Sequence, residues 1–190
     1  MNIYYVYQYL REDQTPYYIG KGKANRINEG HALPLPITER RVMIAENLSE
    51  QDDYSGAILY YSKAIEIRPN WHYPYFMRGN CKLEIQDYYG AIYDFTKTID
   101  IYPNLNVYAY RGYAKNIIND YYGAIFDCTE ALKLANDYQY AFAFYIRAIS
   151  KKEIGDINGA CQDIKKAHNA EIEDDPVGEG YSDLVAEICK

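Results

Sequence analysis

The chain has 190 residues, of which 48% are hydrophobic and 25% charged, a balance that is typical of folded soluble proteins and excludes a disordered chain. No apolar run reaches the roughly 20 residues that a membrane helix needs, so we expect no contact with a membrane. The net charge of −7 lies in residues 51–190, where it repels nucleic-acid phosphates, so any nucleic acid is expected only at residues 1–50.

The first two apolar segments predict a β-hairpin. Residues 3–10 and 16–19 are rich in β-branched and aromatic side chains, which favour strands. The polar residues 11–15 between them suit a turn. A glycine-rich, basic stretch follows at residues 21–26.

These segments resemble the first half of a GIY-YIG nuclease domain. A Tyr-Val-Tyr triplet ends at Tyr7 and a Tyr-Ile-Gly triplet begins at Tyr18, in the manner of the two family signatures. Arg26 matches the arginine that follows, and His31 matches the next polar position. The resemblance implies a metal-dependent DNA endonuclease that uses Mg²⁺. Tyr7 and Tyr18 would then activate and orient water, and Arg26 would stabilise the developing charge.

The nuclease resemblance ends at about residue 50. Residues 40–48 are interpreted as a third strand, which would complete a small α+β element over residues 1–50. Residues 51–67 then look helical but lack a carboxylate where the family holds its metal, so the domain looks truncated and enzyme activity is not expected. Alternatively, residues 41–52 form the first helix of a repeat, with Ala45 at a close helix contact, because periodicity cannot decide over so short a run.

A repeat governs the rest of the sequence. The motif Asp-Tyr-Tyr-Gly-Ala-Ile or a close variant begins at Asp53, Asp87, Asp120 and Asp156, at intervals of 34, 33 and 36 residues. Each unit predicts two helices, the second capped by its aspartate. Small residues four apart from large ones on a shared face predict close packing of the two helices.

The repeat resembles the tetratricopeptide (TPR) pattern over residues 53–170, in about three and a half copies. Gly79, Ala91, Phe95 and Pro103 are among the residues that match the pattern. The resemblance implies a mainly α-helical solenoid of helix pairs that acts as a protein–protein interaction scaffold. At five positions this sequence has a basic residue where the TPR pattern has an uncharged one. The pattern has Leu at Arg78, Arg111 and Arg147, and Tyr at Lys82 and Lys115.

A helix-pair solenoid places the first helix of each pair on its concave side, where a protein or peptide partner would bind. Aromatic and amide side chains suit that role, although the tyrosines could instead pack between repeats. Few basic residues lie there, which disfavours partners with an acidic carboxyl terminus. The residues expected to face inward are Tyr73, Phe76, Asn80, Leu83, Asn106, Tyr113, Asn116, Phe142, Tyr145 and Ile149.

The C-terminal residues 171–190 predict an acidic linker and a capping helix, or alternatively a mobile tail. The four cysteines are far apart and form no CxxC pair, so we expect reduced thiols in a cytoplasmic protein, without a disulfide framework. The scattered histidines predict no metal site, and no cofactor is expected outside the nuclease alternative.

Overall fold

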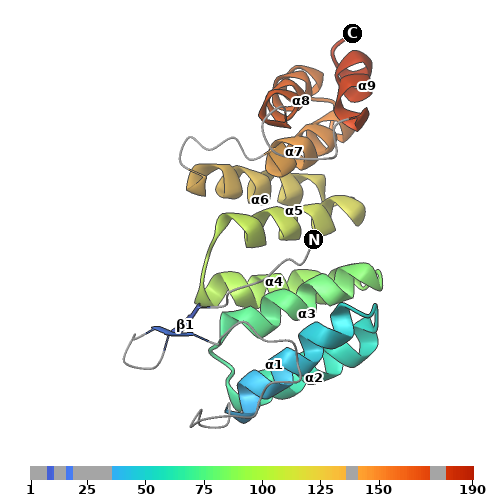
Figure 1. Ribbon diagram of the computed structural model, residues 1–190. Coiled ribbons are helices and arrows are strands. Elements are labelled where there is room, and N and C mark those ends of the chain that lie inside the picture. The colour runs from blue at the N-terminus through green and yellow to red at the C-terminus, as the bar shows by residue number, and fades with distance from the viewer. Residues whose placement is uncertain (1–7, 11–15, 19–35, 136–140, 172–178) are drawn as a thin grey trace. The chain divides into compact units, whose positions relative to one another are not determined.

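The computed structural model describes residues 8–10, 16–18, 36–135, 141–171 and 179–190 (Figure 1). The chain divides into two compact units, residues 1–34 and residues 35–190. In the first unit, β1 (Gln8–Leu10) pairs antiparallel with β2 (Pro16–Tyr18), with Tyr9 opposite Tyr17. The other residues up to 35 of the N-terminal element that we expected lie outside the described residues.

The segment expected as a third strand is a helix, so that prediction was wrong. Helix α1 (Ile37–Ser49) packs against α2 (Tyr54–Ile67), and Val42 and Ala45 are fully buried between them. The alternative helical interpretation is therefore confirmed, and the solenoid begins at α1 rather than near residue 53. The physical reason is tertiary: Ala45 allows close packing on α2, and packing decides the conformation of a short apolar run.

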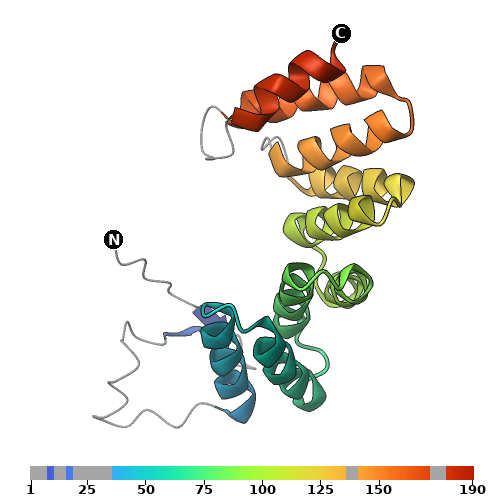
Figure 2. The ribbon, with the colours of Figure 1, turned by 90° about the vertical axis from the view of Figure 1, so that its right-hand side faces the viewer.

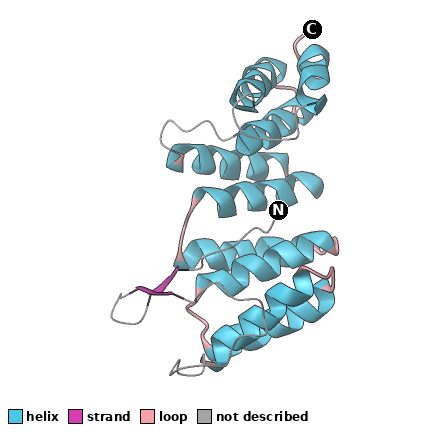
Figure 3. Cartoon of the chain, viewed as in Figure 1, coloured by secondary structure: helices cyan, strands magenta, loops and turns pink. Residues whose placement is uncertain are grey.

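The second unit is a stack of antiparallel helix pairs that follow one another in chain order, which confirms the predicted solenoid (Figures 1 and 3). After α1 and α2, the pairs are α3 (His72–Glu84) with α4 (Tyr88–Ile101), α5 (Leu105–Ile117) with α6 (Tyr121–Leu134), and α7 (Ala141–Glu153) with α8 (Ile157–Glu171). A last helix, α9 (Glu179–Ile188), packs on α8.

The repeated aspartates cap the second helices, as predicted. The Asp87 carboxylate accepts a hydrogen bond of 3.0 Å from the backbone N–H of Gly90, and the same contact recurs in every pair. The preceding residue turns the chain with a positive φ, at Asp52, Gln86, Asn119 and Gly155. One sequence motif therefore sets both the turn and the start of the next helix.

The core between the two helices of a pair depends on small residues facing large ones. A Cβ atom on Gly79 would lie 2.6 Å from Cε1 of Phe95, so the α3–α4 contact needs a glycine there. Ala91 and Phe95 are fully buried beside it.

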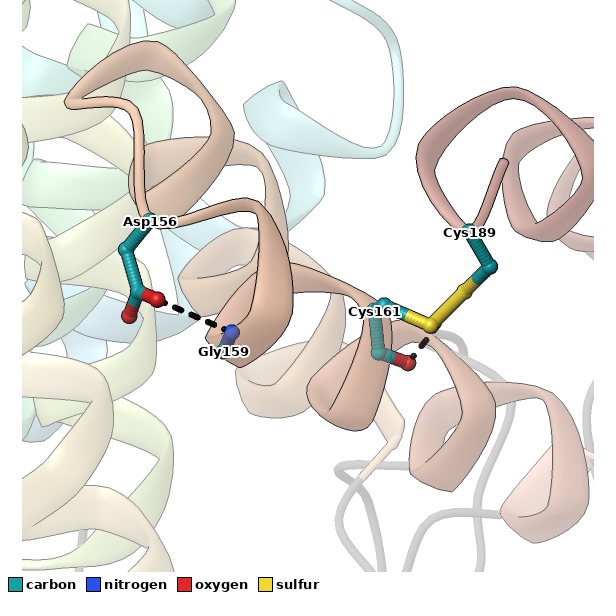
Figure 4. Close-up of a disulfide and its surroundings, with 4 residues drawn as sticks. All are labelled: Asp156, Gly159, Cys161 and Cys189. Atoms are coloured by element: carbon teal, nitrogen blue, oxygen red, sulfur yellow. Dashed lines mark hydrogen bonds between the residues drawn. A yellow bond between two sulfur atoms is a disulfide. The ribbon is translucent and has the colours of Figure 1, made fainter.

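The expectation of unpaired cysteines was wrong for two of the four. A disulfide joins Cys161 on α8 to Cys189 just after α9, while Cys81 and Cys128 are free and buried (Figure 4). The spacing of 28 residues gave no sign of the bond, because the folding back of α9 creates it. Since disulfides are rare in reducing compartments, the bond removes the basis on which a cytoplasmic location was expected.

Candidate functional site

The first helices α1, α3, α5 and α7 contact one another directly from repeat to repeat. The α5 and α7 helices pack together, and side-chain contacts join α1 to α3 and α3 to α5. The first helices form the side expected to bind a partner, and Figure 2 shows the stack turned by 90°. We call this side, formed by residues of α1, α3, α5 and α7 that contact each other across repeats, the first-helix face.

Between α1 and α3, the contacts on the first-helix face are polar. The Tyr73 hydroxyl donates to Oε1 of Glu46 at 2.7 Å, and Oγ of Ser49 lies 3.0 Å from Sγ of Cys81. Burial raises the pKa of Glu46; the Tyr73 hydrogen bond partly opposes this shift and the charge of Glu50 adds to it. Glu46 occupies the position of Asn80 in the next repeat, but it was missed because residues 40–48 were interpreted as a strand.

Aromatic rings continue the face through α3, α5 and α7. Phe76 meets Tyr110 edge to face at 5.8 Å between centroids, and Tyr110 lies 5.6 Å from Phe142. Phe142 in turn contacts Tyr113 at 6.0 Å. Phe76 and Phe142 thus also pack between repeats, as the alternative for the aromatic residues allowed. Tyr110, which links Phe76 to Phe142, was not among the predicted residues.

The ten predicted residues differ in how much surface they offer. Asn106 is exposed, and Tyr73, Phe76, Asn80, Leu83, Tyr113, Asn116, Phe142, Tyr145 and Ile149 are partly buried. Asn116 donates to Oγ of Ser150 at 2.8 Å and so has a partner within the protein. By contrast, Oδ1 of Asn80 is buried and accepts no hydrogen bond, which leaves an acceptor without a donor.

The arginines and lysines that depart from the TPR pattern form ion pairs with buried aspartates. Arg78 donates two hydrogen bonds, of 2.8 and 2.7 Å, to Asp94, which is fully buried and also pairs with Lys82 at 2.9 Å. A third guanidinium nitrogen donates to Ser62 of the preceding repeat. The arrangement recurs twice, and we call the whole set the ion-pair ladder: Ser62, Arg78, Lys82 and Asp94; Thr96, Arg111, Lys115 and Asp127; Thr129, Arg147, Lys151 and Asp163.

The ion-pair ladder changes the electrostatics of the first helices. Six of their cationic side chains are bound inside the fold, with 12 to 20% of each side chain exposed, and are not available to a ligand. Lys152 pairs with Glu187 of α9 at 2.6 Å. Among the described residues, the acidic residues of α1 have one long ion pair, between Glu39 and Arg68 at 3.8 Å, and Glu84 at the α3 C-terminus has none.

Most of the catalytic residues expected for the nuclease alternative lie outside the described residues. Tyr7, Arg26 and His31 lie outside the described residues, and Tyr18 lies in β2, where only the backbone is described. Residues 37–67, which would have to supply the rest of the domain, form the first helix pair instead. Within the described ranges, no group of three His, Cys, Asp or Glu residues could hold a metal ion.

The C-terminal helix covers the last pair. Leu184 and Val185 of α9 pack on a cluster that includes Ala148 and Ile164, and the Cys161–Cys189 disulfide fastens the end of α9 to α8 (Figure 4). No helix of the described part of the chain is long and apolar enough to cross a membrane.

No protein-family model matches the sequence, and a search of curated proteins finds no match either. Solved structures do match. MamA from Desulfovibrio magneticus RS-1 superposes with a TM-score of 0.72 at 16% identity, over 80% of this chain and 82% of that one. YrrB, described as a TPR protein with an unusual peptide-binding site, gives a TM-score of 0.62 at 17% identity, over 78% and 84%.

The second TPR domain of human RPAP3, solved with the HSP70 peptide SGPTIEEVD, is similar over 60% of this chain and 90% of that domain. Its TM-score is 0.53 and its identity 29%. These structures establish a TPR-like helical repeat fold for residues 37–190. The comparisons give no support to the GIY-YIG resemblance or to a nuclease activity.

Proposed function

We propose that the protein is an interaction scaffold whose first-helix face binds a peptide segment of a partner protein. The observation that carries the proposal is the buried, unpartnered Oδ1 of Asn80, on the same face as Tyr113 and the row of rings around Tyr110. An amide acceptor without a donor can take a hydrogen bond from the backbone N–H of a bound segment. The rings beside it offer apolar area for side chains.

The fold supports this role by analogy. Two of the solved TPR structures contain a peptide: the second TPR domain of human RPAP3 holds an HSP70 peptide, and the first TPR of Spaghetti (RPAP3) holds an HSP90 peptide. Such domains bind through side chains on a preformed helical surface, so no large rearrangement is required.

A peptide-phage selection on the immobilised full chain would test the proposal. Selected peptides would then be measured against Asn80→Ala/Tyr113→Ala and against Tyr93→Ala/Tyr122→Ala, a matched pair whose side chains are 57 and 75% exposed on the second helices α4 and α6. We expect the first variant to lose roughly tenfold or more in affinity and the second to bind as the parent does. Peptides that bind both variants equally would show that the first-helix face is not the site.

A further inference from the structure

Three glutamates share one face of α1 and its end. Glu39, Glu46 and Glu50 are spaced seven and four residues apart, so they lie above one another along the helix. Glu39 begins the row at the position that Tyr73 holds in the next repeat. Because Tyr73 donates to Glu46 across the α1–α3 contact, this row belongs to the first-helix face.

Glu39 lacks the donor that a buried carboxylate requires. Its residue exposure is only 9%, and Oε2 is buried with no hydrogen-bond partner. Its Oε1 has one long contact, 3.8 Å to Arg68, whose own side chain is half exposed. Among the described residues Oε2 therefore has no donor, which makes it a candidate acceptor for a donor that a partner supplies.

The row continues onto α3 at Glu84. Glu84 is exposed and holds in the second repeat the position that Glu50 holds in the first. Burial raises the pKa of Tyr113, and the charges of Tyr88 and Glu84 add to that shift. Glu84 is also the last residue of α3, where the helix dipole is negative and a glutamate is locally unfavourable. Residues that break a local rule in this way are expected at functional sites.

Among the described residues, the four glutamates have little compensating charge. Apart from the long Glu39–Arg68 contact, no ion pair among the described residues engages them, and the ion-pair ladder occupies the cations of the neighbouring first helices. Toward α5 and α7 the same face becomes apolar, with Tyr113, Phe142 and Ile149. The face is therefore acidic at one end and aromatic at the other.

We propose that the partner segment is basic: its Lys or Arg side chains meet Glu39, Glu46, Glu50 and Glu84, and its apolar side chains pack toward Tyr113 and Phe142. This inference rests on the proposed function and names the chemical class of its ligand. An acidic segment such as the SGPTIEEVD peptide held by the human RPAP3 domain would place carboxylates against carboxylates here, and like charges across an interface exclude a partner.

Three labelled peptides that share their Leu-Tyr positions and are basic, neutral or acidic at the other four would test the class of ligand: GKRLYKRLYG, GSSLYSSLYG and GEELYEELYG. Their affinities for the full chain would be measured by fluorescence anisotropy at about 50 and about 300 mM salt. We expect the basic peptide to bind about tenfold more tightly than the neutral one and the acidic peptide to bind most weakly, with the differences shrinking at high salt.

Two variants of equal net charge separate the face from the overall charge of the protein. Glu46→Gln/Glu50→Gln/Glu84→Gln removes three charges from the face, and Glu66→Gln/Asp100→Asn/Glu130→Gln removes three from the second helices, so both reduce the net charge from −7 to −4. The first should lower the affinity for the basic peptide about tenfold and the second less than about twofold. Glu39→Gln alone should weaken the basic peptide while leaving the neutral one unchanged.

Two results would overturn the proposed charge class: equal binding of all three peptides, or an equal loss in both triple variants. If the neutral peptide then still depended on Asn80 and Tyr113, the scaffold function would stand and only the basic partner would be wrong. If the scaffold function itself were wrong, the phage-selected peptides would bind the Asn80→Ala/Tyr113→Ala variant as tightly as the parent.

Discussion

The Arg111 guanidinium meets the buried Asp127 carboxylate through two hydrogen bonds, of 2.9 and 2.6 Å, between the two helices of one repeat. Lys115 completes the neutralisation of Asp127 at 2.8 Å, and Arg111 reaches back 3.0 Å to Thr96 of the preceding repeat. One carboxylate thus joins the two helices of a pair, and one guanidinium joins two pairs. A position that is apolar in the TPR pattern has become a polar link between repeats.

Removing one partner of this link should be costly. In Asp127→Ala, Arg111 and Lys115 lose their counter-charge inside the fold, and we expect the free energy of unfolding to fall by about 3 to 5 kcal/mol. Urea denaturation followed by circular dichroism measures the change. Asp100→Ala, on an exposed side chain, is the matched control and should change the stability little. A loss below about 1 kcal/mol at Asp127 would contradict the structural role of the ladder.

Replacing the whole link by apolar residues should be tolerated. The first repeat holds Ile44, Leu48 and Tyr60 at the positions of Arg111, Lys115 and Asp127, so an apolar version of the site already exists in this chain. Leu48 and Tyr60 pack against the core there, and Ile44 is exposed. The triple variant Arg111→Ile/Lys115→Leu/Asp127→Tyr is expected to match or exceed the stability of the parent. The same denaturation curves test it, and a loss as large as that of Asp127→Ala would refute the comparison.

The ladder also predicts how stability depends on pH. Burial alone would raise the pKa of Asp163, but the hydrogen bonds and charges of Arg147 and Lys151 outweigh it, and the pKa lies below its ordinary 3.8. A carboxyl whose pKa is lower in the folded state stabilises the fold above the unfolded value, and this stabilisation is lost as the pH falls through the folded pKa. The midpoint of thermal unfolding should therefore drop steeply below about pH 4. In Asp163→Asn the unfolding midpoint should fall less at low pH than it does in the parent. An identical fall would mean that other groups cause it.

The disulfide should stabilise the C-terminal end. In the chain-entropy model, a bridge that closes 28 residues contributes about 3 to 4 kcal/mol. Cys161→Ser/Cys189→Ser, or the parent with a dithiol reductant, should unfold at a correspondingly lower denaturant concentration.

Burial raises the pKa of Cys128 to about 12, so its thiol should resist alkylation in the folded state, with or without the disulfide. Rapid labelling of Cys128 without unfolding would contradict its burial.

The turn before α4 offers a stabilising substitution. Gln86 has φ +63, and the equivalent residue of the fourth repeat is Gly155 at φ +84. Gln86→Gly should raise the stability by about 0.5 to 1 kcal/mol, because glycine adopts this conformation without a steric penalty. Ile85→Gly, at φ −88, is the control and should lower it. A decrease for both would mean that the added freedom of the unfolded chain outweighs the relief of strain.

Much of the solenoid could be predicted because its signals are local. Asp87 and its counterparts each cap the first turn of the helix that follows, and their spacing gives the repeat length. The ion-pair ladder was also present in the sequence: Arg78 precedes Asp94 by 16 residues, and the same separation recurs between Arg111 and Asp127. It was not predicted because the arginines were compared with the family pattern rather than with acids at a fixed distance.

The other errors have tertiary causes. Residues 40–48 carry too short an apolar pattern to distinguish a strand from a helix, and only packing on α2 decides. The Cys161–Cys189 bond depends on where α9 lies, which no spacing reveals. With α1 interpreted as a helix, Glu46 could have been predicted to lie on the first-helix face, because it directly follows Ala45.

The hydroxyl groups that receive the arginines make the repeats exchangeable. Ser62, Thr96 and Thr129 hold the same place in three successive second helices, so loss of residues 72–104 would present Arg111 to Ser62 with its acceptor intact. The same position in the last repeat is Lys165, which cannot accept a hydrogen bond. A gene for this protein could therefore gain or lose whole units by recombination in the interior of the array, while its two ends would stay fixed.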